Sequence, residues 1–256
     1  MKRRNVGNEP LGALHMSTLG RSVVAEFIGS FFLIIAAIAS TILPVDILKS
    51  DAALAVFMNA IAVAFVLIAL IEMFGSISGG HLNPAVTMSF LLSKEITKKK
   101  AACYIGAQIA GGFIGVMATH AMFYDITPTL LVVSENTKTP GMYFAEFIGT
   151  FLLVAVILGC IKRGSKFAGL SVGAVVGGML MSTSSTMYAN PAVTLARVFT
   201  YAICGIAPTS AIFFIVAEFV GALMATMTFS YLYPRKLGDR SIQLESAKSI
   251  QMAKEQ

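Results

Sequence analysis

The chain has 256 residues, of which 56% are hydrophobic and 12% are charged, and its mean hydropathy is +0.79. A soluble domain carries roughly a quarter of charged residues, so this composition excludes an ordinary soluble protein and indicates an integral membrane protein. The formal net charge of +6 would on its own suggest a nucleic-acid partner, but basic residues in membrane proteins usually mark orientation, so their placement has to decide.

Six apolar segments are long enough to cross a bilayer core of about 30 Å, which takes roughly 20 helical residues. In chain order they lie near residues 22–43, 52–74, 101–123, 142–161, 166–186 and 208–233. Two further apolar stretches, 84–93 and 191–203, are shorter, and at about 1.5 Å per residue the first reaches only about 15 Å, half of the core. We therefore expect six membrane-spanning helices and two re-entrant half-helices.

The second half of the chain repeats the first. The stretch AEFIGSFFLI from Ala25 returns as AEFIGTFLLV from Ala145, and NPAVT from Asn83 returns from Asn190. Each copy holds three full spans and one short segment. Because three is odd, the two copies enter the membrane from opposite faces, which makes the fold an all-α inverted repeat of the kind that builds pores and transporters.

Basic residues follow this topology. Of the 19 Lys and Arg residues, 16 lie in the N-terminus, the 94–100 and 162–166 connections and the C-terminal tail. Since cytoplasmic loops are positive, both termini are expected in the cytoplasm and the chain in the cell (inner) membrane, with no nucleic-acid partner. The expected boundaries are one channel domain, 1–256, with repeats 22–123 and 140–233 and cytoplasmic tails 1–21 and 234–256.

Each repeated box begins with an Asn-Pro pair. The two boxes consist of Asn83, Pro84, Ala85 and of Asn190, Pro191, Ala192. Asn is a preferred helix N-cap, and Pro suits the first helical position because its missing N–H would have no partner there. If both half-helices start at the midplane, their positive ends oppose cations. The two Asn amides can donate to one passing oxygen, which orients water and interrupts proton transfer.

With two such boxes inside duplicated three-span halves, the chain resembles the major intrinsic protein family, the aquaporins and glycerol facilitators, over about residues 20–233. The resemblance implies a homotetramer in which each subunit has its own pore. Glu26 and Glu146 match glutamates that support the re-entrant loops in the family, with proton relay as the alternative. His81 resembles a pore-lining histidine, with a buried structural hydrogen bond as the alternative. Glu72 and Glu218 receive no clear assignment.

The sequence departs from the family at the outer constriction. In most members an Arg directly follows the second Asn-Pro-Ala, but here that residue is Val193 and the Arg is Arg197. One further helical turn places Arg197 about 6 Å nearer the outside. We expect its side chain to lie nearer the outer vestibule, where it can reach water or backbone carbonyls, and to stay out of the narrowest ring.

Spacing assigns the rest of the constriction to Val63, Val176 and Met187, with Gly177 or Gly178 as alternatives in the fifth span. Together with Val193 these residues predict a filter that is wider and less polar than a strict water filter. The arrangement is similar to a bacterial branch of the family associated with arsenic resistance, whose second box also continues with Val.

The expected function is passive conduction of water and small uncharged solutes, glycerol-like polyols or metalloid hydroxides such as arsenite, across the lipid bilayer, with ions and protons excluded. The alternatives are a water-selective aquaporin, an ion-coupled transporter, and a structural membrane protein with a closed pore. The sequence contains no discernible nucleophile and base, metal-ligand cluster or phosphate loop, so we expect no enzymatic activity, no metal and no cofactor.

Overall fold

The fold is given by a computed structural model, which describes residues 18–234. This range is all-helical, and the elements in chain order are α1 (Thr18–Ile42), α2 (Ala52–Phe74), α3 (Pro84–Leu92), α4 (Lys98–Met122), α5 (Pro140–Lys162), α6 (Ala168–Ser182), α7 (Pro191–Ala196) and α8 (Pro208–Leu232). A π-helical turn, Leu43–Ile47, extends α1, and a 3₁₀ turn, Arg197–Phe199, extends α7. Most of the two predicted tails, residues 1–17 and 235–256, lies outside the described residues.

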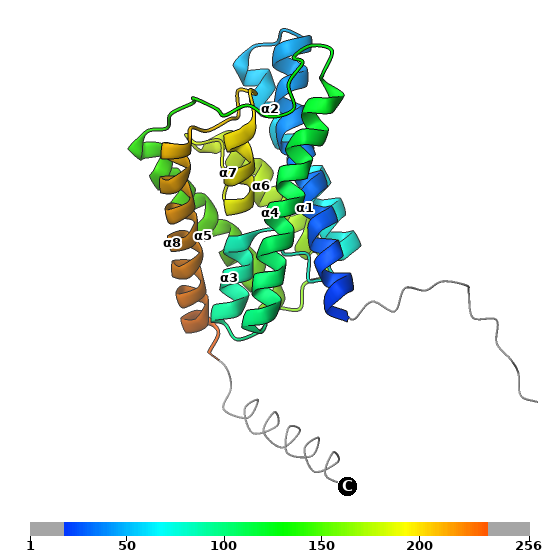
Figure 1. The fold of residues 1–256 in the computed structure, drawn as a ribbon. Helices are drawn as coiled ribbons and strands as arrows, with labels where there is room; N and C mark the ends of the chain where they lie inside the picture. The colour runs from blue at the N-terminus through cyan, green and yellow to red at the C-terminus, as the bar shows by residue number, and fades with distance from the viewer. Residues whose placement is uncertain (1–17, 235–256) are drawn as a thin grey trace, which may run out of the picture.

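The long helices surround the two short ones. α1 packs against α4 and α2, α5 packs against α8 and α6, and α2 and α6 join the two halves. Figure 1 shows α3 and α7 inside this bundle, one toward each end. α1 begins and α8 ends at the same end of the bundle, called here the termini end, and the opposite end is called the far end. The arrangement is the predicted one, six outer helices around two half-helices.

Glycines allow the same close crossing in both halves. Gly111 on α4 lies directly against the carbonyl oxygen of Phe27 on α1, and Gly221 on α8 lies against that of Phe147 on α5. A Cβ at either glycine would collide with backbone, which cannot move aside. Small residues at such crossings let membrane helices approach closely enough for van der Waals packing, which is the main attraction between helices in lipid.

The fifth span is shorter than predicted. Five of the described helices are long and apolar enough to cross a membrane, whereas α6 has 15 residues and ends at Ser182, short of the expected residue 186. Beyond it the chain turns at residues 183–186, and Thr186, Met187 and Ala189 have positive φ. These conformations are incompatible with a right-handed helix. They turn the backbone amides of residues 188 and 189 toward Glu146, which accepts hydrogen bonds from both.

The second half-helix is also shorter than the predicted 191–203. α7 has six residues and passes into the 3₁₀ turn. The carbonyl of Arg197 accepts from the amide of Ile206 at 3.1 Å, and that of Val198 accepts from Ser134 at 2.8 Å. Tertiary partners therefore replace the next helical hydrogen bonds, and an extended segment of the 123–139 connection crosses the end of α7.

Candidate functional site

Both Asn-Pro boxes start a half-helix. Asn83 has φ −158° and ψ 122°, and its Oδ1 accepts from the amides of Ala85 at 2.8 Å and Val86 at 3.4 Å. Asn190 has φ −156° and ψ 107° and accepts in the same way from Ala192 at 3.0 Å and from Val193 at 3.5 Å. Capping consumes the amide oxygen of each Asn and leaves its NH₂ group to point elsewhere.

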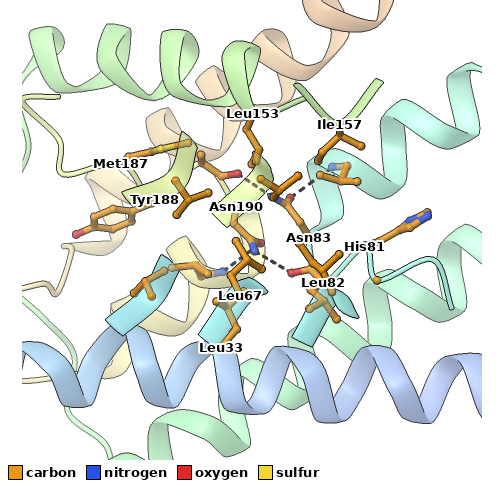
Figure 2. Close-up of a pocket in the computed structure, with 18 of the residues that line it drawn as sticks. Leu33, Leu67, His81, Leu82, Asn83, Leu153, Ile157, Met187, Tyr188 and Asn190 are labelled. Atoms are coloured by element: carbon orange, nitrogen blue, oxygen red, sulfur yellow. Dashed lines mark hydrogen bonds between the residues drawn. The ribbon is translucent and has the colours of Figure 1, made fainter. Parts of the chain in front are cut away.

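The two NH₂ groups tie the half-helices together. Asn83 Nδ2 donates to the carbonyl of Ala189 at 2.8 Å, and Asn190 Nδ2 donates to the carbonyl of Leu82 at 2.9 Å. Figure 2 shows both amides side by side at the centre of the pocket. Each bond uses one N–H, and within residues 18–234 the second N–H of each Asn has no protein partner. These second N–H groups are the donors that a molecule in the cavity meets.

A buried carboxylate holds the loop in front of each box. Glu26 accepts from the amides of His81 at 3.0 Å and Leu82 at 2.6 Å, and Glu146 accepts from the amides of Tyr188 at 2.9 Å and Ala189 at 2.6 Å. Both glutamates are 0% exposed. The left-handed φ of the residues just before Asn83 and Asn190, 50° and 47°, is strained for side chains other than glycine. These charge-assisted hydrogen bonds offset that strain.

One cavity runs past both boxes along the inside of the bundle. Its lining includes Phe90 and Ile161 near the termini end, Asn83 and Asn190 in the middle, and Arg197 at the far end. Leu33, Leu67, Leu153 and Ile157 surround the amides (Figure 2). The wall is thus mostly apolar, with few polar groups that face a solute.

The four residues assigned to the constriction by spacing all line this cavity. They are Val63, Val176, Met187 and Val193, and each is buried. Gly177 faces Ala64 on α2 and Gly178 has open space beside it, and neither lines the cavity. His81 also lines the cavity, with its Nδ1 3.1 Å from Thr87 Oγ1 and its ring 4.3 Å from that of Phe90.

A family profile described as "Major intrinsic protein" matches residues 13–188, more than half of the chain. The chain belongs to the major intrinsic protein family. It is 38% identical over 215 residues to "Aquaglyceroporin AqpS" of Rhizobium meliloti (strain 1021), which covers 84% of this chain and 91% of that one. It is 35% identical over 162 residues to "Glycerol uptake facilitator protein-like 6" of Lactiplantibacillus plantarum, which covers 60% and 70%.

Solved structures show the same fold. The X-ray structure of the aquaglyceroporin from Plasmodium falciparum aligns with a TM-score of 0.65 at 22% identity, and the alignment covers 83% of this chain and 96% of that chain. At this identity the likeness supports the arrangement of helices and half-helices alone. This major intrinsic protein therefore shares the architecture of that aquaglyceroporin. Which solutes its cavity accepts depends on the residues that line it.

Arg197 lines the cavity and reaches a backbone carbonyl, as one of the two predicted alternatives has it. The side chain is 2% exposed, so it does not reach the bulk water of an outer vestibule. Its Cζ lies 4.2 Å from the ring centre of Tyr188, and its Nη2 donates to the carbonyl of Ala37 at 3.1 Å. The prediction continued the half-helix through residue 203, but α7 ends at Ala196, and the guanidinium stacks on Tyr188 inside the bundle.

Glu218 is the site residue that the sequence did not assign. It is 0% exposed, and its Oε1 accepts from Thr194 Oγ1 at 2.6 Å and from the amide of Asn190 at 3.2 Å. The internal repeat could have assigned it, because Glu218 in AEFVGALMA aligns with Gln108 in AQIAGGFIG. Gln108 contacts Thr87, the counterpart of Thr194. Among residues 18–234 no group of three His, Cys, Asp or Glu side chains is arranged to hold a metal.

Proposed function

We propose that this protein is a passive channel for water and small uncharged solutes, glycerol-like polyols or metalloid hydroxides such as arsenite, and that it excludes ions and protons. The observation that carries the proposal is the cavity that runs past both capped half-helices and has an apolar wall. Its polar groups are few, chiefly the amides of Asn83 and Asn190 and the guanidinium of Arg197. A neutral solute exchanges hydrogen bonds with these donors along an apolar wall, whereas an ion loses hydration that the wall cannot replace.

Charge selection follows from the two half-helices. Each helix start carries a positive partial charge of roughly half an elementary charge, and the caps bring both starts to one place in the cavity. The carboxyl groups of Glu26, Glu146 and Glu218 accept hydrogen bonds from the loops and from the start of α7 and do not line the cavity, so none of the three can coordinate an ion inside it. The names of the relatives, an aquaglyceroporin and a glycerol uptake facilitator, agree with a neutral solute.

Stopped-flow light scattering on proteoliposomes tests the proposal. Sucrose reports water permeability, and inward gradients of glycerol and of arsenite report solute permeability. We expect all three permeabilities to exceed those of protein-free liposomes. Water flux alone would favour a water-selective aquaporin, uptake that responds to a pH gradient would favour a coupled transporter, and no flux would favour a closed structural protein.

The proposal includes the assembly and the orientation. We infer a homotetramer in the cell (inner) membrane with both termini cytoplasmic, supported by family membership and by the basic residues of the connections at the termini end. The protein binds no cofactor and performs no reaction in this role. Light scattering of the detergent-solubilised protein gives the oligomer mass, and impermeant labelling of a cysteine added beside Lys138 or beside Lys98 reports which end faces the outside.

A further inference from the structure

The two boxes place the same pair of positions in contact at opposite ends of the cavity. His81 and Phe90 lie two residues before and seven residues after Asn83, and their ring centres are 4.3 Å apart. Tyr188 and Arg197 lie at the same offsets from Asn190, with Cζ 4.2 Å from the ring centre. All four residues line the cavity. The seventh position after the Asn therefore faces the cavity in both halves, and only the far end carries a cation there.

The guanidinium of Arg197 makes one hydrogen bond and has further N–H donors without a partner among the described residues. Nη2 donates to the carbonyl of Ala37, while Nε and Nη1 are buried and have no hydrogen-bond partner among the described residues. Arg carries five N–H donors, and buried donors without a partner are costly, above all on a charged group. Since the side chain lines the cavity, a hydroxyl oxygen of a molecule inside it is the partner that would satisfy these donors.

Tyr188 is a rigid support for this group. Its hydroxyl donates to the carbonyl of Cys204 at 2.6 Å, its amide donates to Glu146 at 2.9 Å, and its ring meets Phe214 edge to face at 5.1 Å. The ring is therefore fixed at both ends and along one edge. A cation placed over such a ring is attracted by the negative face of the ring, and the attraction is stronger where water is excluded.

We propose that Arg197, positioned by Tyr188, is the hydroxyl-binding site of the far-end constriction and determines how well polyhydroxylated neutral solutes pass relative to water. The proposal rests on the proposed channel function and names the residues that set its selectivity. Val193, directly after the second box, has no side-chain hydrogen-bond donor. Arg197, about one helical turn later in the chain, supplies the donors in its place. A polyol sheds several waters at an apolar constriction, so a fixed donor there matters more to the polyol than to a single water.

Replacing Arg197 by Phe, the residue at the equivalent position 90, separates the effect of the hydrogen-bond donors from the effect of side-chain packing. Arg197→Phe places at the far end the residue found at position 90, so it keeps a large side chain against Tyr188 and removes charge and donors. We expect the glycerol-to-water permeability ratio to fall roughly tenfold, which equals about 1.4 kcal/mol. Tyr188→Leu, which removes the support, should lower the ratio similarly, and the double variant should fall no further than either single one. Tyr188→Phe keeps the ring and should stay within about twofold of wild type.

Lys138 offers a matched control. Its Nζ lies 5.8 Å from the centre of the same Tyr188 ring, but the residue does not line the cavity. Lys138→Gln removes a neighbouring positive charge and should leave the ratio unchanged. Should Arg197→Phe not be recovered as a folded protein, Arg197→Gln, which is neutral and shorter, replaces it in the same measurement.

The permeability ratios decide between the outcomes. Equal ratios in wild type and in the Arg197 variant, or additive effects of the Tyr188 and Arg197 changes, would overturn the role of this pair. A wild-type protein that conducts neither water nor glycerol would overturn the channel function itself. The two failures are distinguishable because the first occurs in vesicles whose wild-type protein conducts.

Discussion

Glu218 occupies in the second half the place that Gln108 occupies in the first, yet the two residues face their neighbouring glutamates with opposite chemistry. Gln108 Nε2 donates to Glu26 at 2.8 Å and to Thr87 at 3.0 Å. Glu218 accepts from Thr194 Oγ1 at 2.6 Å and from the amide of Asn190 at 3.2 Å through one carboxyl oxygen, and its other carboxyl oxygen is buried without a hydrogen-bond partner among the described residues. The second half therefore lacks the amide hydrogen that Gln108 offers to Glu26, and a buried acceptor without a donor is costly.

This relationship predicts that Glu218→Gln is tolerated. The glutamine supplies the donor that Gln108 supplies in the first half and keeps an acceptor for Thr194 and the Asn190 amide. We expect a melting temperature in detergent equal to or above that of wild type, with water permeability retained. Glu218→Leu removes the acceptor and should lower the unfolding free energy by about 1–3 kcal/mol. If glutamine destabilises as much as leucine does, a hydrogen-bond donor at position 218 does not stabilise the second half.

Glu26 should be indispensable to folding. Its carboxylate accepts from four donors, those of Ser78, His81, Leu82 and Gln108. Glu26→Gln turns an N–H₂ group toward these donors, and we expect a loss of about 3 kcal/mol or more, seen as a low yield of folded protein and an earlier thermal transition. Glu72→Gln is the control, because Glu72 is exposed on α2 and should leave both measurements unchanged. A normal melting curve for Glu26→Gln would show that another contact holds the loop.

Selection against cations should depend on the two central amides. In Asn83→Asp/Asn190→Asp the donors to Ala189 and Leu82 are lost and negative charge opposes the positive half-helix ends, so some cation current should flow in planar bilayers. Asn136→Asp is the control, since Asn136 is an exposed Asn of the connection between α4 and α5 that does not line the cavity. Equal conductance of the double variant and wild type, both folded, would place the barrier elsewhere.

Position 193 should control the width of the far end. Val193 lines the cavity and is 6% exposed, so Val193→Arg brings a second guanidinium into the space near Arg197. We expect glycerol permeability to fall roughly tenfold, with a smaller loss for water. Val193→Ile adds volume without charge and should change the ratio of the two permeabilities little. Equal losses of glycerol and water in Val193→Arg, measured per channel in proteoliposomes, would contradict a size and donor filter at this position.

The sequence by itself determined the features that depend on local chemistry. Hydropathy predicted the outer helices, because a long apolar segment is stable in lipid whatever its neighbours in the fold are. The Asn-Pro pairs predicted the starts of α3 and α7 to the residue, since N-cap chemistry acts within one turn. The repeat together with the odd number of spans predicted the inverted architecture.

Only the tertiary structure decided where α6 and α7 end and where Arg197 points. α6 stops at Ser182 because the amides beyond it bond to Glu146 on α5, and α7 stops at Ala196 because the carbonyls beyond it accept from residues 134 and 206. Glu146 and Ser134 are distant in sequence and Ile206 lies beyond the predicted half-helix, so the local apolar pattern predicts continuation. The direction of the Arg197 guanidinium depends on the ring of Tyr188 and the carbonyl of Ala37 on α1, contacts that exist only once the half-helix is seated in the bundle.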